Sequence, residues 1–175
     1  KLRVIHATRH IPLKEVPAAI TFESLLETIR LTHEGLQDMG IDAPYLVVAG
    51  LNPHNGDGGL LGREEIEVIG PAVEAARAEG INVEGPYPSD SMLYRVQRDG
   101  YDAVIAMYHD QGHILAKTYG FEESYTVTLG LPIIRTSVDH GTAFGKAGKG
   151  TANPRSMMEA TRAAVQIAVH RRKGS

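Results

Sequence analysis

Short apolar runs alternate with longer amphipathic segments along this chain. The short runs are rich in β-branched residues, which is typical of strands buried on both faces of a sheet. The runs that predict strands lie at residues 2–8, 45–50, 81–85 and 102–108, with further candidates at 125–130 and 133–137. The segments that predict helices lie at residues 21–40, 63–80, 89–98 and 154–169. Because strands and helices alternate, we expect an α/β fold, an α/β/α layered domain with a largely parallel mixed sheet.

The boundaries of these elements follow from local chemistry. Thr21 is a candidate N-cap for the first long helix, and Gly40 and Gly80 are candidate stops. The stretch "AMYHDQGHILAK" (residues 106–117) follows an apolar run and is predicted to be a polar loop at the edge of the sheet. We therefore expect no pair of histidines at helical spacing.

Three histidines fall just beyond predicted strands, namely His10, His54 and His109. The carboxyl ends of parallel strands share one edge of a sheet, so these imidazoles are expected at a common edge. A transition metal bound by a few imidazoles keeps positions open for substrate oxygens. A single loop histidine more often only forms hydrogen bonds, so the residues alone leave a metal site and a structural role equally open. We expect His6 to be structural and His113 to support His109.

The glycine-rich segments give weaker signals. Residues 56–62, "GDGGLLG", and 145–151, "GKAGKGT", depart from the dinucleotide fingerprint and from the phosphate-binding loop, respectively. Residues 139–154, "DHGTAFGKAGKGTANP", still bring many glycines together, which lets backbone amides approach a ligand. Asn153 is suited to pairing with a base edge. This segment is a weak indication of nucleotide binding.

Composition narrows the classes of function. The 175 residues carry a net charge of -3 and no cysteine. Neither a basic field for nucleic acid nor a thiolate metal site is therefore expected. The longest apolar runs fall short of the roughly 20 residues that cross a bilayer, so we predict a cytoplasmic protein without membrane contact. The chain starts at Lys1, without methionine, and is expected to be a piece of something longer.

Several motifs together resemble the 4-hydroxythreonine-4-phosphate dehydrogenase family. They occur in family order over nearly the whole chain: "GLNPHNGDGG", "GREEIEVIGP", "GPYPSDS", "DAVIAMYHDQGH", "LGLPIIRTSVDHGTA" and "AGKG". Residues 140–154 are also similar to the adenosine-binding loop of isocitrate and isopropylmalate dehydrogenases. The resemblance implies a fold of that wider group.

The same resemblance implies an enzyme that depends on NAD and a divalent metal, either zinc or magnesium, cobalt or manganese. Such an enzyme oxidises a phosphorylated 3-hydroxy acid, and the 3-keto acid then loses carbon dioxide. The metal ligands implied are His10, His54 and His109, shared across a homodimer interface. The arrangement to test is whether His10 of one subunit meets His54 and His109 of the other.

Further site residues are implied by matching positions. Lys117, Thr126 and Arg135 are implied to bind substrate. Lys117 is also implied to be catalytic, together with Asp90 and Asp110 near the metal. The residues implied to bind the cofactor are His140, Gly141, Thr142, Ala143 and Asn153.

The chain also departs from the family. Family chains are nearly twice as long, so we expect residues 1–175 to be the C-terminal portion of a two-domain dehydrogenase. A metal-binding, dimerising domain is expected over about 1–135, and a cofactor loop and returning helix over 136–175. Thr126 and Arg9 stand where the family has asparagine and threonine.

These departures and the "HDQGH" form keep several alternatives open. One is a four-carbon sugar-acid phosphate as substrate, such as threonate or erythronate 4-phosphate. Another is an aromatic cis-dihydrodiol carboxylate. The remaining alternatives are a metal-dependent hydrolase or lyase that does not use NAD, and an inactive metal-binding or dimerising fragment.

Overall fold

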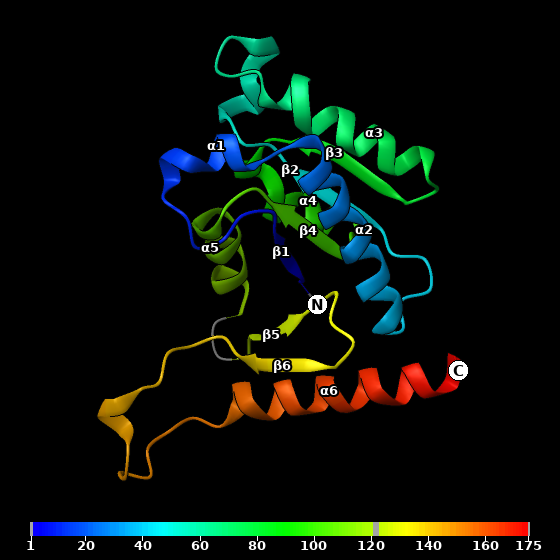
Figure 1. Ribbon diagram of the computed structural model, residues 1–175. Helices are drawn as coiled ribbons and strands as arrows, with labels where there is room; N and C mark the ends of the chain where they lie inside the picture. Colours follow the sequence, from blue (N-terminus) through cyan, green and yellow to red (C-terminus); the bar gives the residue numbers. More distant parts are fainter. Residues whose placement is uncertain (1, 121–122, 175) are drawn as a thin grey trace.

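A parallel four-stranded sheet forms the centre of the molecule (Figure 1). The computed structural model describes residues 2–120 and 123–174. In spatial order the strands are β1 (Val4–His6), β4 (Ala103–Ala106), β2 (Leu46–Ala49) and β3 (Val83–Tyr87). All neighbouring strands are parallel, so their carboxyl ends meet at one edge. This confirms the predicted α/β fold with a parallel sheet.

Helices cover both faces of this sheet. The larger core lies under α2 (Phe22–Asp38) and α3 (Gly70–Ala78), which bury side chains such as Ile29 and Val73 against β2 and β4. The smaller core lies on the opposite face, under α4 (Met92–Asp99) and α5 (His109–Gly120). Because β2 and β4 are buried along their whole length, their sequences are continuous apolar runs.

The start predicted for the first long helix is confirmed, whereas the start predicted for the second differs in the structure. Thr21 is the N-cap of α2: its hydroxyl accepts a hydrogen bond from the Ser24 amide at 3.1 Å, and the Ser24 hydroxyl accepts one from the Thr21 amide at 3.0 Å. The helix predicted from residue 63 instead begins with one π-helical turn, Glu65–Ile69, before α3. Turns of this kind are rare in proteins, and those that occur often lie at functional sites. A short α1 (Val16–Ala19) precedes α2.

The last two strands form a sheet of their own. β5 (Tyr125–Thr128) and β6 (Arg135–Val138) are antiparallel and do not join the central sheet, so the expected mixed sheet is divided into two. The long α6 (Arg155–Gly174) packs along this ribbon (Figure 1). Arg171 of α6 pairs with Asp38 of α2 at 2.5 Å. The boundary predicted near residue 135 falls at the start of β6 and stays a prediction.

The polar loop predicted within residues 106–117 is wrong, because α5 begins at His109, with only two residues between it and the end of β4. The segment contains good helix formers. The negative charge of Asp110 in the first turn also interacts favourably with the helix dipole and stabilises the helix. Gly112 is a poor helix former and makes the helix hard to predict from the sequence. Glycine is nevertheless required there, because a Cβ would lie 2.3 Å from Nε2 of His6. As a result, His109 and His113 form the pair at helical spacing that was not expected.

No helix among residues 2–120 and 123–174 combines the length and the apolar character needed to cross a membrane.

Candidate active site

His10 and His109 meet at the carboxyl edge of the sheet. β1 and β4 are paired in register, with His6 opposite Ala106, so the segments that follow them leave the sheet side by side. The Thr8 hydroxyl donates to the carbonyl of Met107 at 2.7 Å and fixes this exit. The ring centroids of His10 and His109 lie 5.6 Å apart within one chain. The strand ends therefore place two of the three predicted ligands together.

A row of side chains continues along one face of α5. His109, His113 and Lys117 are spaced at successive turns, and the first two rings lie 4.3 Å apart. Together with Asp110, Ile114 and Thr118, they line an open groove of about 460 Å³. The ring of His6 in β1 stacks on the ring of His113, with the centroids 4.6 Å apart. The helix thus presents imidazoles and one ammonium group to a common groove.

Burial keeps two of these imidazoles neutral. Burial, and next the nearby His113, lowers the pKa of His6 to about 4. Burial also lowers the pKa of His113, and the carboxylate of Asp139 partly offsets that shift. Nε2 of His6 and Nδ1 of His113 are buried without a hydrogen-bond partner in the part of the chain that the structure describes. Neither ring adds positive charge to the groove at neutral pH.

The chemistry of His109 fits a metal ligand. Its Nδ1 lies 2.6 Å from a carboxylate oxygen of Asp110, which leaves Nε2 for a metal. A carboxylate behind an imidazole fixes the ring and raises its basicity, as in many zinc sites. In the described ranges, no three histidine, aspartate or glutamate side chains of this one chain converge on a metal position. A complete site built on His10 and His109 needs a ligand from elsewhere.

His54 lies in a separate, unusual loop. It follows β2, its side chain is exposed, and it makes no ring contact with the other histidines of the described residues. Residues 54–58 all have positive φ, with values of 51°, 59°, 77°, 44° and 65°. The geometry of one chain thus groups His10 with His109, whereas the arrangement posed from the sequence grouped His54 with His109.

The side chain of Gln111 organises the space between the strand ends. Its side-chain amide donates to the carbonyl of Gly50 at 2.9 Å and to the hydroxyl of Ser89 at 2.8 Å. Its side-chain oxygen accepts from the amide of Met107 at 2.6 Å. Gln111 thereby joins β2, β4 and the turn that carries Asp90, whose own side chain is exposed. The only sequence signal was an amide side chain directly after a strand.

Two predicted substrate residues lie on the ribbon. Thr126 and Arg135 are exposed and share one of its faces, because Thr126 is opposite Ser137 and Arg135 is opposite Thr128. The Arg135 guanidinium donates to the Thr128 hydroxyl at 2.9 Å. Asp139, just beyond β6, acts electrostatically on His113. The exit of the ribbon therefore approaches the groove on α5.

The predicted cofactor residues lie on an arm, defined here as residues 139–154, which projects from the body between β6 and α6 (Figure 1). Ala143 has a left-handed backbone with φ 48°. The Asn153 side-chain oxygen accepts from the amide of Arg155 at 3.1 Å. The five predicted cofactor residues are all exposed: His140, Gly141, Thr142, Ala143 and Asn153.

Known proteins similar to this chain include dehydrogenases. This chain is 55% identical to 4-hydroxythreonine-4-phosphate dehydrogenase of Chromobacterium violaceum, over 97% of this chain and 52% of that protein. It is 52% identical to D-threonate 4-phosphate dehydrogenase of Cupriavidus necator, over 98% of this chain and 52% of that one. The chain spans about half the length of the curated relatives it matches.

Solved structures agree with these relatives. The crystal structure of 4-hydroxythreonine-4-phosphate dehydrogenase from Klebsiella pneumoniae superposes with a TM-score of 0.86 at 45% identity, over 96% of this chain and 51% of that one. A β-decarboxylating dehydrogenase of Thermococcus kodakarensis shares the fold, with a TM-score of 0.54 at 19% identity, over 85% of this chain and 42% of that one. The family described as pyridoxal phosphate biosynthetic protein PdxA matches residues 1–164, and the chain belongs to that family.

Proposed function

We propose that this chain supplies one half of a dehydrogenase that uses NAD and a divalent metal to oxidise a phosphorylated 3-hydroxy acid, followed by decarboxylation. The observation that carries the proposal is the His10–His109 pair at the sheet edge, with Asp110 behind His109 and the α5 groove beside it. Ligands in such folds bind beyond the carboxyl ends of strands. The names of the relatives supply the reaction class.

His10 and His109 of one subunit would hold the metal together with His54 of a second subunit in a homodimer. When bound, the metal polarises the substrate hydroxyl and then the new carbonyl. Zinc suits an imidazole set best, and magnesium, cobalt and manganese are the alternatives. Asp110 keeps the His109 ring oriented, and the uncharged rings of His6 and His113 add no positive charge that would oppose metal binding.

Lys117 and Arg135 are the proposed anchors for the anionic groups of the substrate, and the Thr126 hydroxyl adds a hydrogen bond. Arginine binds phosphate or carboxylate with two parallel bonds, whereas lysine acts as a compact charge. Lys117, Asp90 and Asp110 are the candidates to take the hydroxyl proton while the hydride passes to NAD. The carboxylate then leaves as carbon dioxide, and its bonding electrons stay on the carbon that is next protonated.

The arm is the proposed NAD site. Its exposed glycines and the left-handed backbone at Ala143 leave room for a close approach of the cofactor. The relatives' names make 4-hydroxythreonine 4-phosphate and D-threonate 4-phosphate the first substrates to compare. With the first of them, the enzyme would serve pyridoxal phosphate biosynthesis in the cytoplasm, and the cis-dihydrodiol carboxylate remains the less favoured substrate.

The test is an assay of nicotinamide reduction by the complete protein, with any natural flanking sequence retained. We expect reduced nicotinamide to form with zinc and one of the two phosphorylated acids, and a chelator to abolish it. A His54→Ala, His109→Ala double variant should lose activity, whereas His170→Gln on α6 serves as the histidine control. Full activity of the double variant would contradict the metal assignment.

Two other results identify the competing functions. Turnover that does not depend on NAD would indicate a metal-dependent hydrolase or lyase. Zinc binding without NAD binding or turnover would indicate a metal-binding, dimerising module.

A further inference from the structure

A buried carboxylate lies behind the loop that carries His54. Glu65 is 4% exposed. One of its oxygens accepts hydrogen bonds from the backbone amides of Leu51 at 2.7 Å and of Asn52 at 2.6 Å. Its other oxygen accepts from the side-chain amide of Asn52 at 2.9 Å. A buried charge needs such partners, and here the loop itself supplies them.

The loop is held in a conformation that it would not adopt unaided. His54, Asn55 and Asp57 all have positive φ, which is unfavourable for residues with a side chain. Such backbones persist only where the surroundings determine them, and they are concentrated at functional sites. The surroundings must therefore hold this turn.

Glu65 and Asn52 provide that hold on one side. The π-helical turn that starts at Glu65 widens the helix at the point where the carboxylate is directed toward the loop. Asn52 also donates to Glu64 at 2.7 Å, and a Cβ on Gly62 would lie 2.3 Å from the Asn52 side chain. On this side, the position of Gly62 leaves no room for a side chain.

Asn55 anchors the other side of His54. Its side-chain amide donates to the carbonyl of Pro86 at 2.6 Å, next to the end of β3. A Cβ on Gly50 would lie 2.2 Å from the Asn55 side-chain oxygen, so this contact is also tight. The backbone on both sides of His54 is thereby fixed, although His54 itself is exposed.

We propose that Glu65 is a positioning residue for metal binding: it holds the left-handed turn of residues 54–58 in the conformation that presents His54 as a ligand. It acts through the amides of Leu51 and Asn52 and does not touch the metal. The inference rests on the proposed role of His54. It adds a residue that the sequence motif alone would class as the exposed start of a helix.

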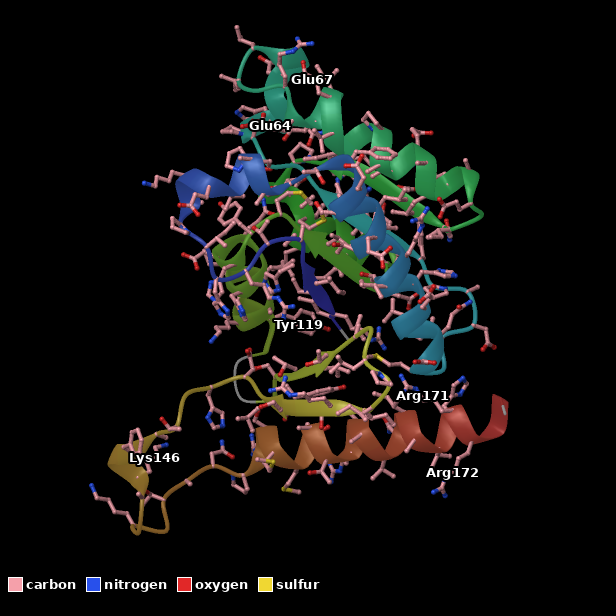
Figure 2. The ribbon with its side chains drawn as sticks, in the orientation of Figure 1. Glu64, Glu67, Tyr119, Lys146, Arg171 and Arg172 are labelled. Carbon is pink, nitrogen blue, oxygen red and sulfur yellow. The ribbon has the colours of Figure 1, made fainter. Side chains whose placement is uncertain are left out.

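Glu65→Gln is the informative variant, and Glu67→Gln is its matched control. Glutamine keeps the size of Glu65 but loses the charge and turns one acceptor into a donor that faces Asn52. Glu67 lies two residues further on, with its side chain 57% exposed and paired with Arg63 at 2.5 Å. Figure 2 shows Glu64 and Glu67 at the same end of the molecule as this loop.

The first measurement is amide hydrogen exchange of the metal-free complete protein. In Glu65→Gln we expect exchange at residues 51–59 to be about tenfold faster or more, because charge-assisted hydrogen bonds are lost. Glu67→Gln should exchange like the unsubstituted protein. Unchanged exchange in Glu65→Gln would overturn the proposal that Glu65 holds the loop.

The second measurement is calorimetric titration with zinc chloride. Glu65→Gln should lower zinc affinity by about 10- to 100-fold, as the loss of partners behind a ligand typically does. The same substitution should have no further effect in a His54→Ala background. If Glu65→Gln does not fold, Glu65→Asp, which keeps the charge with a shorter reach, carries the test and should give a smaller loss.

The possible failures can be told apart. If His54→Ala lowers zinc affinity but Glu65→Gln lowers only thermal stability, Glu65 is merely structural and the inference is wrong. If His54→Ala binds zinc as tightly as the unsubstituted protein, His54 is not a metal ligand. The inference that Glu65 supports metal binding is then also wrong.

Discussion

Two glycine-rich regions of this chain are held by different kinds of hydrogen bonds. The first is the sheet edge, defined as the loop of residues 50–62, residues 63–65 that follow it, the end of β1 with His6, and the start of α5. There Glu65 and Gln111 accept and donate part-buried hydrogen bonds that hold the loop from outside it. The second is the arm, which is exposed from residue 140 onward and contains local turn bonds such as Lys146 to Ala143 at 2.8 Å. Figure 2 shows Lys146 out on the arm, away from the body.

The difference shows that glycine content alone does not decide whether a loop is rigid. A loop is fixed when a buried polar group from another element satisfies its backbone, because breaking that bond leaves an unpaired buried group. The sheet edge would therefore be preorganised for the metal proposed above. The arm would gain order from its ligand and would lose part of the binding free energy in doing so.

Alanine at one glycine in each region should give the largest contrast. Gly56 has φ 77°, and a Cβ there would lie 2.7 Å from the backbone oxygen of Gly62. We expect Gly56→Ala to destabilise the protein by about 3 kcal/mol, from the left-handed backbone and the clash together. Gly148 has a similar φ of 71° with open space around it, so Gly148→Ala should cost only about 1 kcal/mol. Urea unfolding measures both values, and equal costs would remove the distinction between the regions.

The sheet edge should also respond to pH through His6. Its pKa is about 4 in the folded chain and about 6.5 when unfolded, so between these values the unfolded chain binds the extra proton. The contribution of His6 to the free energy of unfolding is fully present above pH 6.5 and is lost as the pH falls toward 4. His6→Leu should flatten that decline and raise stability at neutral pH by about 1–2 kcal/mol, because a buried unpaired nitrogen is removed.

Urea unfolding at several pH values tests this expectation. His140→Leu on the exposed arm is the matched control and should leave the pH dependence unchanged. A His6→Leu protein that loses stability with falling pH as steeply as the unsubstituted chain would contradict the role given to His6.

The smallest expected effect concerns the arm alone. Because Lys146 and Lys149 are exposed on a segment with few buried contacts, we expect trypsin to cleave there before it cleaves at Arg63 of the sheet edge. Added NAD should slow cleavage in the arm. Mass spectrometry of the first fragments checks the order, and an initial cut at Arg63 would reverse the comparison.

Local sequence patterns predicted those parts of the fold that local chemistry determines. The apolar runs around Val47 and Val104 gave the central strands, and Thr21 gave the helix cap. The pattern failed at α5, because Gly112 and the polar residues around it are typical of a loop. The reason for that glycine is a contact with His6, more than a hundred residues away in the chain.

The candidate site shows the same limit. The placement of His10 and His109 after strands was visible in the sequence, because parallel strands share an edge. The stacking of His6 on His113 and the burial of Glu65 depend on tertiary packing and were not visible. A pair of glutamates before an amphipathic segment ordinarily marks a solvated helix start, and only the folded loop shows where Glu65 is directed.

His109, supported by Asp110, is proposed to bind a metal together with His10. Anomalous X-ray scattering at the zinc edge from crystals of the zinc-loaded complete protein tests this proposal most directly. We expect the zinc ion at about 2.0–2.1 Å from Nε2 of His109, with His10 of the same chain and His54 of a second subunit as further ligands. Zinc bound between His109 and His113 instead, or no zinc at this edge, would contradict the proposed ligand set.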